Sequence, residues 1–146
     1  MNWAPHVTVA TIVERDGRFL LVYEEADGKQ VYNQPAGHLD PNETLQEAAI
    51  RETLEETAWH VTLTGVVGVN LYEAPSNGVT YLRTTFIAEA LNQDTERSLD
   101  TGIIEAVWLT YEEILERRAQ LRSPMTLRII DEYRAGRRFP MDVIGA

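Results

Sequence analysis

A cluster of glutamates lies on one face of a segment with helical periodicity, residues 44–58. With Leu45 at zero on a helical wheel of about 100° per residue, Glu52 and Glu56 fall within roughly 60° of it, and Glu55 lies about 80° away. Leu45 and two alanines begin this stripe, so the carboxylates continue a face suited to burial. Burying an ionised glutamate without a partner is costly, whereas Mg²⁺ binds carboxylate oxygens readily. The spacing therefore predicts a site for a hard divalent cation, Mg²⁺ or Mn²⁺ as its substitute.

An arginine is placed to support this cluster. Glu43, Glu47 and Arg51 follow one another at i, i+4 and i+8, and each acid precedes the base, which is the favourable orientation for helical ion pairs. We expect Arg51 to pair with Glu43 or Glu47 and to orient its neighbour Glu52 without binding metal itself.

Most glutamate clusters are solvated helix faces, and the helix alone does not exclude that alternative. The loop before the helix favours the metal site instead. The loop and helix together match G-x5-E-x7-RE-x2-EE, the spacing of the Nudix box. The probability of matching all six positions by chance in such a chain is on the order of 10⁻⁴. Residues 37–59 therefore resemble a Nudix box, whose fixed positions are occupied by Gly37, Glu43, Arg51, Glu52, Glu55 and Glu56.

Three positions depart from the family pattern. Ala58 replaces the usual glycine, and Trp59 and Thr53 replace aliphatic residues. Because alanine is penalised at positive φ, Ala58 is expected to disfavour a left-handed helix exit. None of the three carries the expected chemistry, so activity is expected to be retained.

The resemblance implies a Nudix fold of the α/β (α+β) class, an α/β/α sandwich around a mixed β-sheet. It also implies attack of water on a phosphorus of a diphosphate linkage, assisted by Mg²⁺. The implied metal ligands are Glu52, Glu55, Glu56 and the carbonyl of Gly37. The Arg51–Glu43 pair would support them, and Glu52 is the first choice for the general base.

Further segments, residues 5–10, 33–39, 121–124 and 136–140, are similar to one bacterial branch of the family. That branch implies a phosphatase acting on nucleoside tri- and diphosphates and on hydroxymethylpyrimidine diphosphate, a thiamine precursor. Two alternatives remain: a MutT-like or ADP-ribose pyrophosphatase, and a Nudix domain that binds a ligand without catalysis.

Several other residues are weaker candidates for the site. Glu105, in an expected late strand, is a candidate extra ligand or base, although a solvated strand glutamate is an equally good interpretation. The candidates for substrate binding are cationic side chains for phosphate, the histidine after the box glycine, and two aromatic residues for ring stacking. These residues are Arg83, Arg122, His38, Tyr23 and Tyr32.

Composition limits the partners. The chain has 146 residues, 13 basic and 23 acidic side chains and no cysteine. A net charge of −10 predicts a surface that repels nucleic-acid polymers and anionic membranes, whereas small polyphosphates can bind through a divalent cation. No signal-peptide pattern or long apolar run is present. We expect a single cytoplasmic domain over residues 1–146, as a monomer or homodimer.

The elements that position the candidate residues follow from periodicity and turn signals. Strands are expected at about residues 6–13, 19–23, 30–32, 61–72, 79–91 and 103–109, and helices at 44–58, 111–120 and 124–134. Asp-Gly pairs at 16–17 and 27–28 predict hairpins, and residues 34–37 are expected to interrupt regular structure. Thr44 and Glu47 predict a capping box. Ile50 and Leu54, opposite the glutamates, predict that the first helix is covered on two sides.

Overall fold

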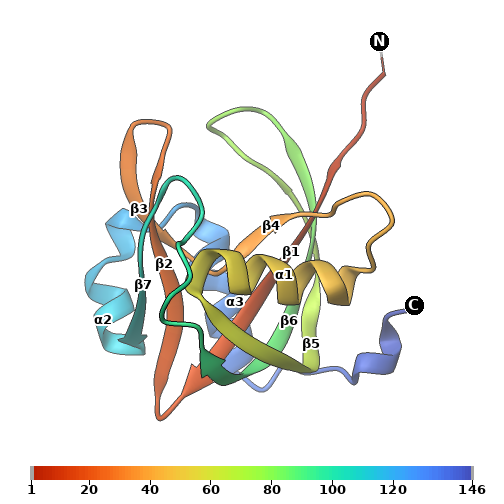
Figure 1. The fold of residues 1–146 in the computed structure, drawn as a ribbon. Coiled ribbons are helices and arrows are strands. Elements are labelled where there is room, and N and C mark those ends of the chain that lie inside the picture. The colour runs from red at the N-terminus through yellow and green to blue at the C-terminus, as the bar shows by residue number, and fades with distance from the viewer. Residues whose placement is uncertain (1, 146) are drawn as a thin grey trace.

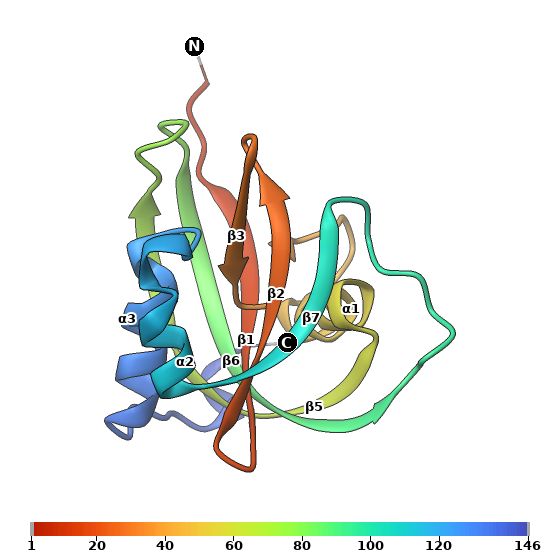
Figure 2. The same cartoon turned by 90° about the vertical axis from the view of Figure 1, so that its left-hand side faces the viewer.

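A computed structural model describes residues 2–145 and contains a seven-stranded mixed sheet with helices on both faces. Figures 1 and 2 show α1 on one face and α2 and α3 on the other, so the expected α/β/α sandwich is confirmed. The strands are β1 (His6–Arg15), β2 (Arg18–Ala26), β3 (Lys29–Asn33), β4 (Ala36–His38), β5 (Trp59–Glu73), β6 (Thr80–Gln93) and β7 (Ile103–Thr110). The helices are α1 (Leu45–Thr57), α2 (Tyr111–Glu116) and α3 (Pro124–Arg134), with 3₁₀ turns η1 (Arg118–Gln120) and η2 (Met141–Val143).

The sheet divides between β1 and β2. These strands pair only beside their shared turn, through the register Glu14–Phe19 and Arg15–Arg18. Farther from the turn, β1 pairs with β4 and, in parallel, with β6, whereas β2 pairs with β3 and β7. The two halves of the sheet therefore separate, and residues from both halves are available to line the space between them.

The predicted hairpins form at both Asp-Gly pairs. Asp16 and Gly17 have φ values of 51° and 76°, and Asp27 and Gly28 have 51° and 77°. Two consecutive residues at positive φ are typical of the tight turns that match the twist of antiparallel strands. The turns therefore fix the register of β1, β2 and β3.

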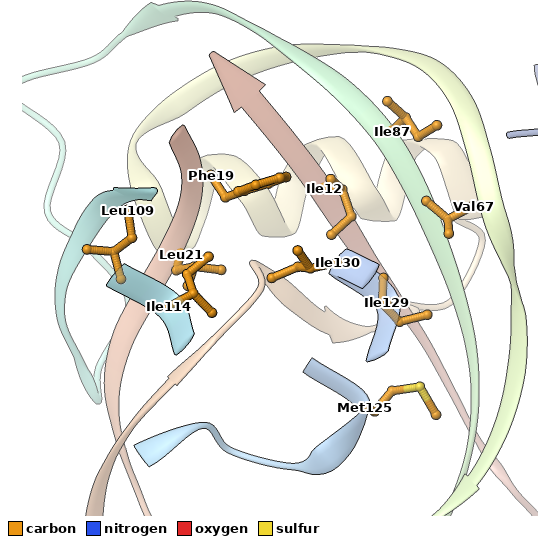
Figure 3. Close-up of a cluster of buried hydrophobic side chains, with 10 residues drawn as sticks. All are labelled: Ile12, Phe19, Leu21, Val67, Ile87, Leu109, Ile114, Met125, Ile129 and Ile130. Atoms are coloured by element: carbon orange, nitrogen blue, oxygen red, sulfur yellow. The ribbon is translucent and has the colours of Figure 1, made fainter. Parts of the chain in front are cut away.

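The hydrophobic core consists of three clusters, and the two that include helix residues lie on opposite sides of the sheet. Figure 3 shows the larger cluster, where side chains of β1, β2, β5, β6 and β7 gather around those of α2 and α3, with Ile129 and Ile130 fully buried at its centre. On the other face, Ala48 and Ala49 of α1 pack against Val9, Val66 and Phe86. Small alanines allow α1 to lie close to the sheet, which fixes the depth of the glutamates one turn later.

Both ends of α1 are capped by hydrogen bonds, which involve side chains at its start and the backbone at its end. At its start, Thr44 Oγ1 accepts from the Glu47 N–H at 3.0 Å, and Glu47 Oε1 accepts from the Thr44 N–H at 2.9 Å, which is the predicted capping box. At its end, Ala58 adopts φ 64° and ψ 13° and donates to Leu54 O at 2.8 Å. The left-handed exit that Ala58 is expected to disfavour therefore forms despite the alanine. Its carbonyl also accepts from the Asp94 N–H at 2.8 Å, which helps to offset a backbone cost of roughly 1–2 kcal/mol.

The buried face of α1 includes the threonine that replaces an aliphatic residue. Thr53 donates to Ala49 O at 2.8 Å and accepts from Thr11 Oγ1 of β1 at 2.8 Å, so its hydroxyl is satisfied inside the core. The expected second covered face is found only in part. Ile50 is 37% exposed, whereas Leu54 is half-buried and two N–H groups of the loop before β7 donate to carbonyls at the end of α1.

Two further expectations need correction. Ala36–His38 forms β4 instead of an irregular segment, because β1 has a free side for pairing where β2 moves away from it. The helix expected over residues 111–120 is divided into α2 and η1, with Arg117 between them outside helical geometry at φ −104°.

The capping box gives a first prediction. Thr44→Ala removes the side-chain acceptor for the Glu47 N–H, and we expect it to lower the free energy of unfolding by about 1 kcal/mol. Chemical denaturation measures this change. Thr95→Ala, an exposed position in the loop before β7, is the matched control and should leave the unfolding midpoint unchanged.

Candidate active site

A pocket of about 640 Å³ lies where the two halves of the sheet separate. Its wall is built by β1, β2, β3, β4, α1, the β5–β6 hairpin and the start of α3. The titratable residues in its lining are Glu24, Asp27, Lys29, His38, Asp40, Glu52, Glu56, Tyr72, Tyr81, Arg83 and Arg122. Acidic and basic side chains therefore share one concave surface.

Glu52 and Glu56 reach this pocket from the buried stripe of α1. Glu56 Oε1 accepts from the Ala36 N–H at 2.9 Å, which holds the carboxyl against β4. Burial, with Glu24 and Glu52 nearby, raises the pKa of Glu56 to about 8. Burial also raises the pKa of Glu52 above its ordinary value. Both carboxyls lie on the face of α1 that the helical wheel predicted, and for both the effect of burial on the pKa exceeds that of the hydrogen bonds they accept.

Arg51 joins three carboxylates. Its Nε donates to Glu43 Oε2 at 2.6 Å, and its Nη1 donates to Glu52 Oε1 at 2.8 Å and to Glu55 Oε1 at 2.7 Å. The hydrogen bond to Glu43 raises the pKa of Arg51 and lowers that of Glu43. Of the two predicted partners, the structure therefore pairs Arg51 with Glu43, while Glu47 is used in the capping box.

A third acid joins Glu52 and Glu55. Carboxylate oxygens of these two residues and of Asp100 all lie within 4.8 Å of one another. Asp100 comes from the loop before β7 and is held there because its N–H donates to Glu55 O at 3.0 Å. Burial and the charge of Glu55 raise the pKa of Asp100.

These carboxylates fit a hard divalent cation. Three acidic oxygens at one point repel one another, and such oxygens are the ligands that Mg²⁺ and Mn²⁺ prefer. Glu52 is shared between this group and the pocket, where it lies with Glu56. The residues present therefore suit a metal bound between α1 and the pocket.

Gly37 is required by its contact with Glu52. A Cβ built on Gly37 would overlap the Glu52 carboxylate, so any larger residue at this position displaces that side chain. This contact explains physically why glycine suits the first position of the motif.

We therefore predict that Gly37→Ala lowers kcat by about 100-fold, since Glu52 must leave its place beside Arg51 and the other candidate metal ligands. Steady-state kinetics measures the effect. At Gly145 an added Cβ meets nothing within 4 Å, so Gly145→Ala should retain normal kinetics. A fully active Gly37→Ala would contradict this account of the contact.

The basic part of the pocket is formed by two arginines. Arg122 Nη1 donates to Glu24 Oε2 at 3.2 Å, and Glu24 is only 8% exposed. Arg83 Nη2 donates to Gln34 Oε1 at 2.9 Å, while its Nε is shielded from solvent and has no hydrogen-bond partner. Burial, followed by the charge of Arg122, lowers the pKa of Arg83 to about 10.

His38 lies at the pocket among other rings. Its Nε2 is 3.1 Å from His6 Nδ1, and the ring of Tyr81 is edge-on to both histidines. Burial lowers the pKa of His38, with smaller contributions from His6 and Arg122. The structure thus brings His38, Arg83 and Arg122, three of the five predicted substrate contacts, to one pocket.

Three other predicted residues lie elsewhere. Tyr23 and Tyr32 pack against each other with ring centroids 4.6 Å apart, and Tyr32 contacts the core cluster beneath α2 and α3. Glu105 is exposed and pairs with Tyr23 across β2 and β7, so it shares the face of Tyr23. None of the three is part of the pocket wall.

Sequence reasoning missed Asp100, Glu24 and Gln34. Glu24 lies on the same face of β2 as Leu20 and Val22, but residues 19–22 are all apolar and buried, so no alternation marked that face in the sequence. Asp100 and Gln34 lie in irregular segments, where periodicity carries no information. Both are placed by contacts with residues distant in the sequence.

The comparisons with known proteins agree with this geometry. The NUDIX domain family matches residues 3–129, so the chain belongs to the Nudix family. Phosphatase NudJ of Escherichia coli (strain K12) is 40% identical to it over 141 residues, which cover 97% of this chain and 91% of the relative. A NUDIX hydrolase from Nitrosomonas europaea is 41% identical, with a TM-score of 0.95 over 98% of this chain and 97% of the other. The chain is a Nudix hydrolase acting on phosphoanhydrides.

A more distant structure shows the fold alone. The NUDIX domain of Shewanella oneidensis NrtR, solved in complex with ADP ribose, has a TM-score of 0.73 at 16% identity, covering 92% of this chain and 90% of that one.

Among residues 2–145 here, no helix is both long and apolar enough to cross a membrane.

Proposed function

We propose that this chain is a Mg²⁺-dependent phosphatase that hydrolyses nucleoside tri- and diphosphates and hydroxymethylpyrimidine diphosphate. The observation that carries the proposal is the meeting of both charges in one pocket, where Glu52 and Glu56 share the wall with Arg83 and Arg122. Similarity to Phosphatase NudJ over nearly the whole chain supports the choice of branch.

The carboxylates have distinct roles in this proposal. Glu52, Glu55 and Glu56, the carbonyl of Gly37, and Asp100 are the candidate metal ligands. When bound, the metal supplies Lewis-acid polarisation of phosphoryl oxygens and a lowered pKa for water. Glu52 accepts the proton of the attacking water.

The remaining residues orient the reactants. Arg51 holds Glu52 and Glu55 in place through its hydrogen bonds. Arg83, Arg122 and His38 contact the substrate from the pocket wall. Tyr23, Tyr32 and Glu105 have no part in this proposal, because they lie outside that wall. A cytoplasmic location and a monomeric or dimeric state stay predictions from the sequence.

Phosphorus NMR tests the proposed reaction. The protein is incubated with GTP and Mg²⁺, and we expect orthophosphate to be released stepwise while GTP is converted to GDP and then to GMP. Each step consumes one water and breaks one phosphorus–oxygen bond. Hydroxymethylpyrimidine diphosphate, assayed in parallel, should give its monophosphate and orthophosphate.

Other products would favour the alternatives. Pyrophosphate formed together with GMP would indicate a MutT-like pyrophosphatase and reject the proposed branch. Turnover of ADP-ribose but not of GTP would indicate an ADP-ribose pyrophosphatase. Ligand binding without any metal-dependent turnover would indicate a binding module.

A further inference from the structure

Gln34, which is buried, and Arg83, which is half-buried at the pocket, form a pair anchored to α3. Gln34 is 1% exposed, and its Nε2 donates to Thr126 O at 2.7 Å. Its Oε1 accepts from Arg83 Nη2 at 2.9 Å. The amide is thus fixed at both ends, and it holds the Arg83 guanidinium in a single orientation at the pocket.

Arg83 is half-buried and, within the described chain, has no carboxylate in contact with its guanidinium. Among residues 2–145, no carboxylate oxygen lies within 4.0 Å of its nitrogens, and its Nε–H is shielded from water without an acceptor. The charge of Arg122, from the same pocket, disfavours the cation, whereas Glu56 and Glu24 favour it more weakly and without contacting it. A buried donor or charge left unpaired is costly, so this site is suited to an anionic ligand.

The chemistry of the guanidinium identifies the class of ligand. Arginine presents its donors in a planar fork that matches two oxygens of a phosphate. A neutral ring carbonyl would fill one hydrogen-bonding position but leave the charge uncompensated. A phosphate satisfies both requirements.

We propose that Arg83, positioned by Gln34, binds the substrate phosphate adjacent to the one attacked at the glutamates. This inference rests on the proposed function, because it assigns the two ends of the phosphate chain to the two charged parts of the same pocket. The site thereby requires at least two linked phosphates, and phosphate monoesters lack the group that Arg83 binds.

Binding of a diphosphate that cannot be hydrolysed tests the inference independently of turnover. Methylenediphosphonate is titrated calorimetrically into wild-type protein and variants in the presence of Mg²⁺. We expect Arg83→Met to weaken its binding by about 10–100-fold and Arg83→Lys by about 10-fold, since lysine lacks the fork. Arg118→Met, which removes the same charge from an exposed position in η1, should bind normally.

Gln34 is tested by variants that keep Arg83. Gln34→Glu gives the guanidinium a carboxylate partner that competes with the ligand, although it loses the N–H that donates to Thr126 O. We expect about 10-fold weaker binding, and a KM for GTP raised by a similar factor while kcat stays within about threefold. If Gln34 had only a structural role, its substitution would not raise KM while leaving kcat nearly unchanged.

The two proposals fail in different ways. If wild-type protein binds methylenediphosphonate and Arg83→Met or Gln34→Glu binds it equally well, the role of Arg83 is overturned. Absence of methylenediphosphonate binding by wild-type protein overturns it as well. If wild-type protein binds the diphosphonate through Arg83 but does not hydrolyse GTP, the inference stands and the proposed function is rejected.

Discussion

Glu56→Gln is expected to lower kcat by about 10³-fold, equivalent to roughly 4 kcal/mol of lost transition-state stabilisation. The substitution keeps the size of the side chain and an oxygen that can accept from the Ala36 N–H, so the fold should persist. It removes one negative oxygen from the group proposed to hold Mg²⁺. Steady-state kinetics over a range of Mg²⁺ concentrations measures the loss and any weakening of metal affinity.

The same variant should be more stable than wild-type protein when metal is absent. The pKa of Glu56 is about 8 in the folded state, above its ordinary value of 4.5, so folding favours the protonated carboxyl. Stability contributed by that proton is present below about pH 4.5 and is lost as pH rises toward 8. Glutamine titrates nowhere in this range, and we expect it to add about 3 kcal/mol at neutral pH. Denaturation in EDTA across this pH range measures the difference.

Glu47→Gln is the matched control on the same helix. Glutamine can replace glutamate in a capping box, and residue 47 is exposed and away from the pocket wall. Its kinetics and metal response should equal those of the wild type. Wild-type turnover by Glu56→Gln would refute the role assigned to Glu56.

The sequence was most informative where structure depends on near neighbours. The capping box, the Asp-Gly turns and the glutamate stripe all follow from residues within one or two turns of each other. Their positions in the fold agree with expectation because helical and strand periodicities are set by backbone geometry. The contact of Arg51 with Glu43 is of the same kind.

Contacts between distant segments account for the differences. Tyr23 and Glu24 are adjacent in β2, so their side chains point to opposite faces of the sheet. The sequence does not show which of these faces lies against α1. The pairing of β2 with β7 then places Glu105 beside Tyr23, away from the pocket. Asp100 reaches Glu55 through a single backbone hydrogen bond from an irregular loop. Such placements depend on tertiary packing, which one sequence does not reveal.

Arg51→Met is expected to lower the free energy of unfolding by about 2 kcal/mol in metal-free protein. The change removes hydrogen bonds to Glu43, Glu52 and Glu55 and leaves Glu52 and Glu55 near Asp100 without a cation. Breaking a fully buried pair costs about 3–5 kcal/mol, and the 26% exposure of Arg51 justifies the smaller figure. Thermal unfolding in EDTA measures the loss.

Mg²⁺ should restore part of this stability, because the ion and Arg51 neutralise the same carboxylates. The rise in melting temperature between EDTA and saturating Mg²⁺ is therefore expected to be larger in Arg51→Met than in wild-type protein. Turnover should still fall by about 10–100-fold, since Glu52 loses the contact that orients it. Arg128→Met breaks an exposed pair with Glu132 at 3.7 Å and should change stability by less than about 0.5 kcal/mol. If Arg51→Met behaved like Arg128→Met, Arg51 would be one more surface charge, and the orientation of Glu52 would have to come from its packing against Gly37 alone.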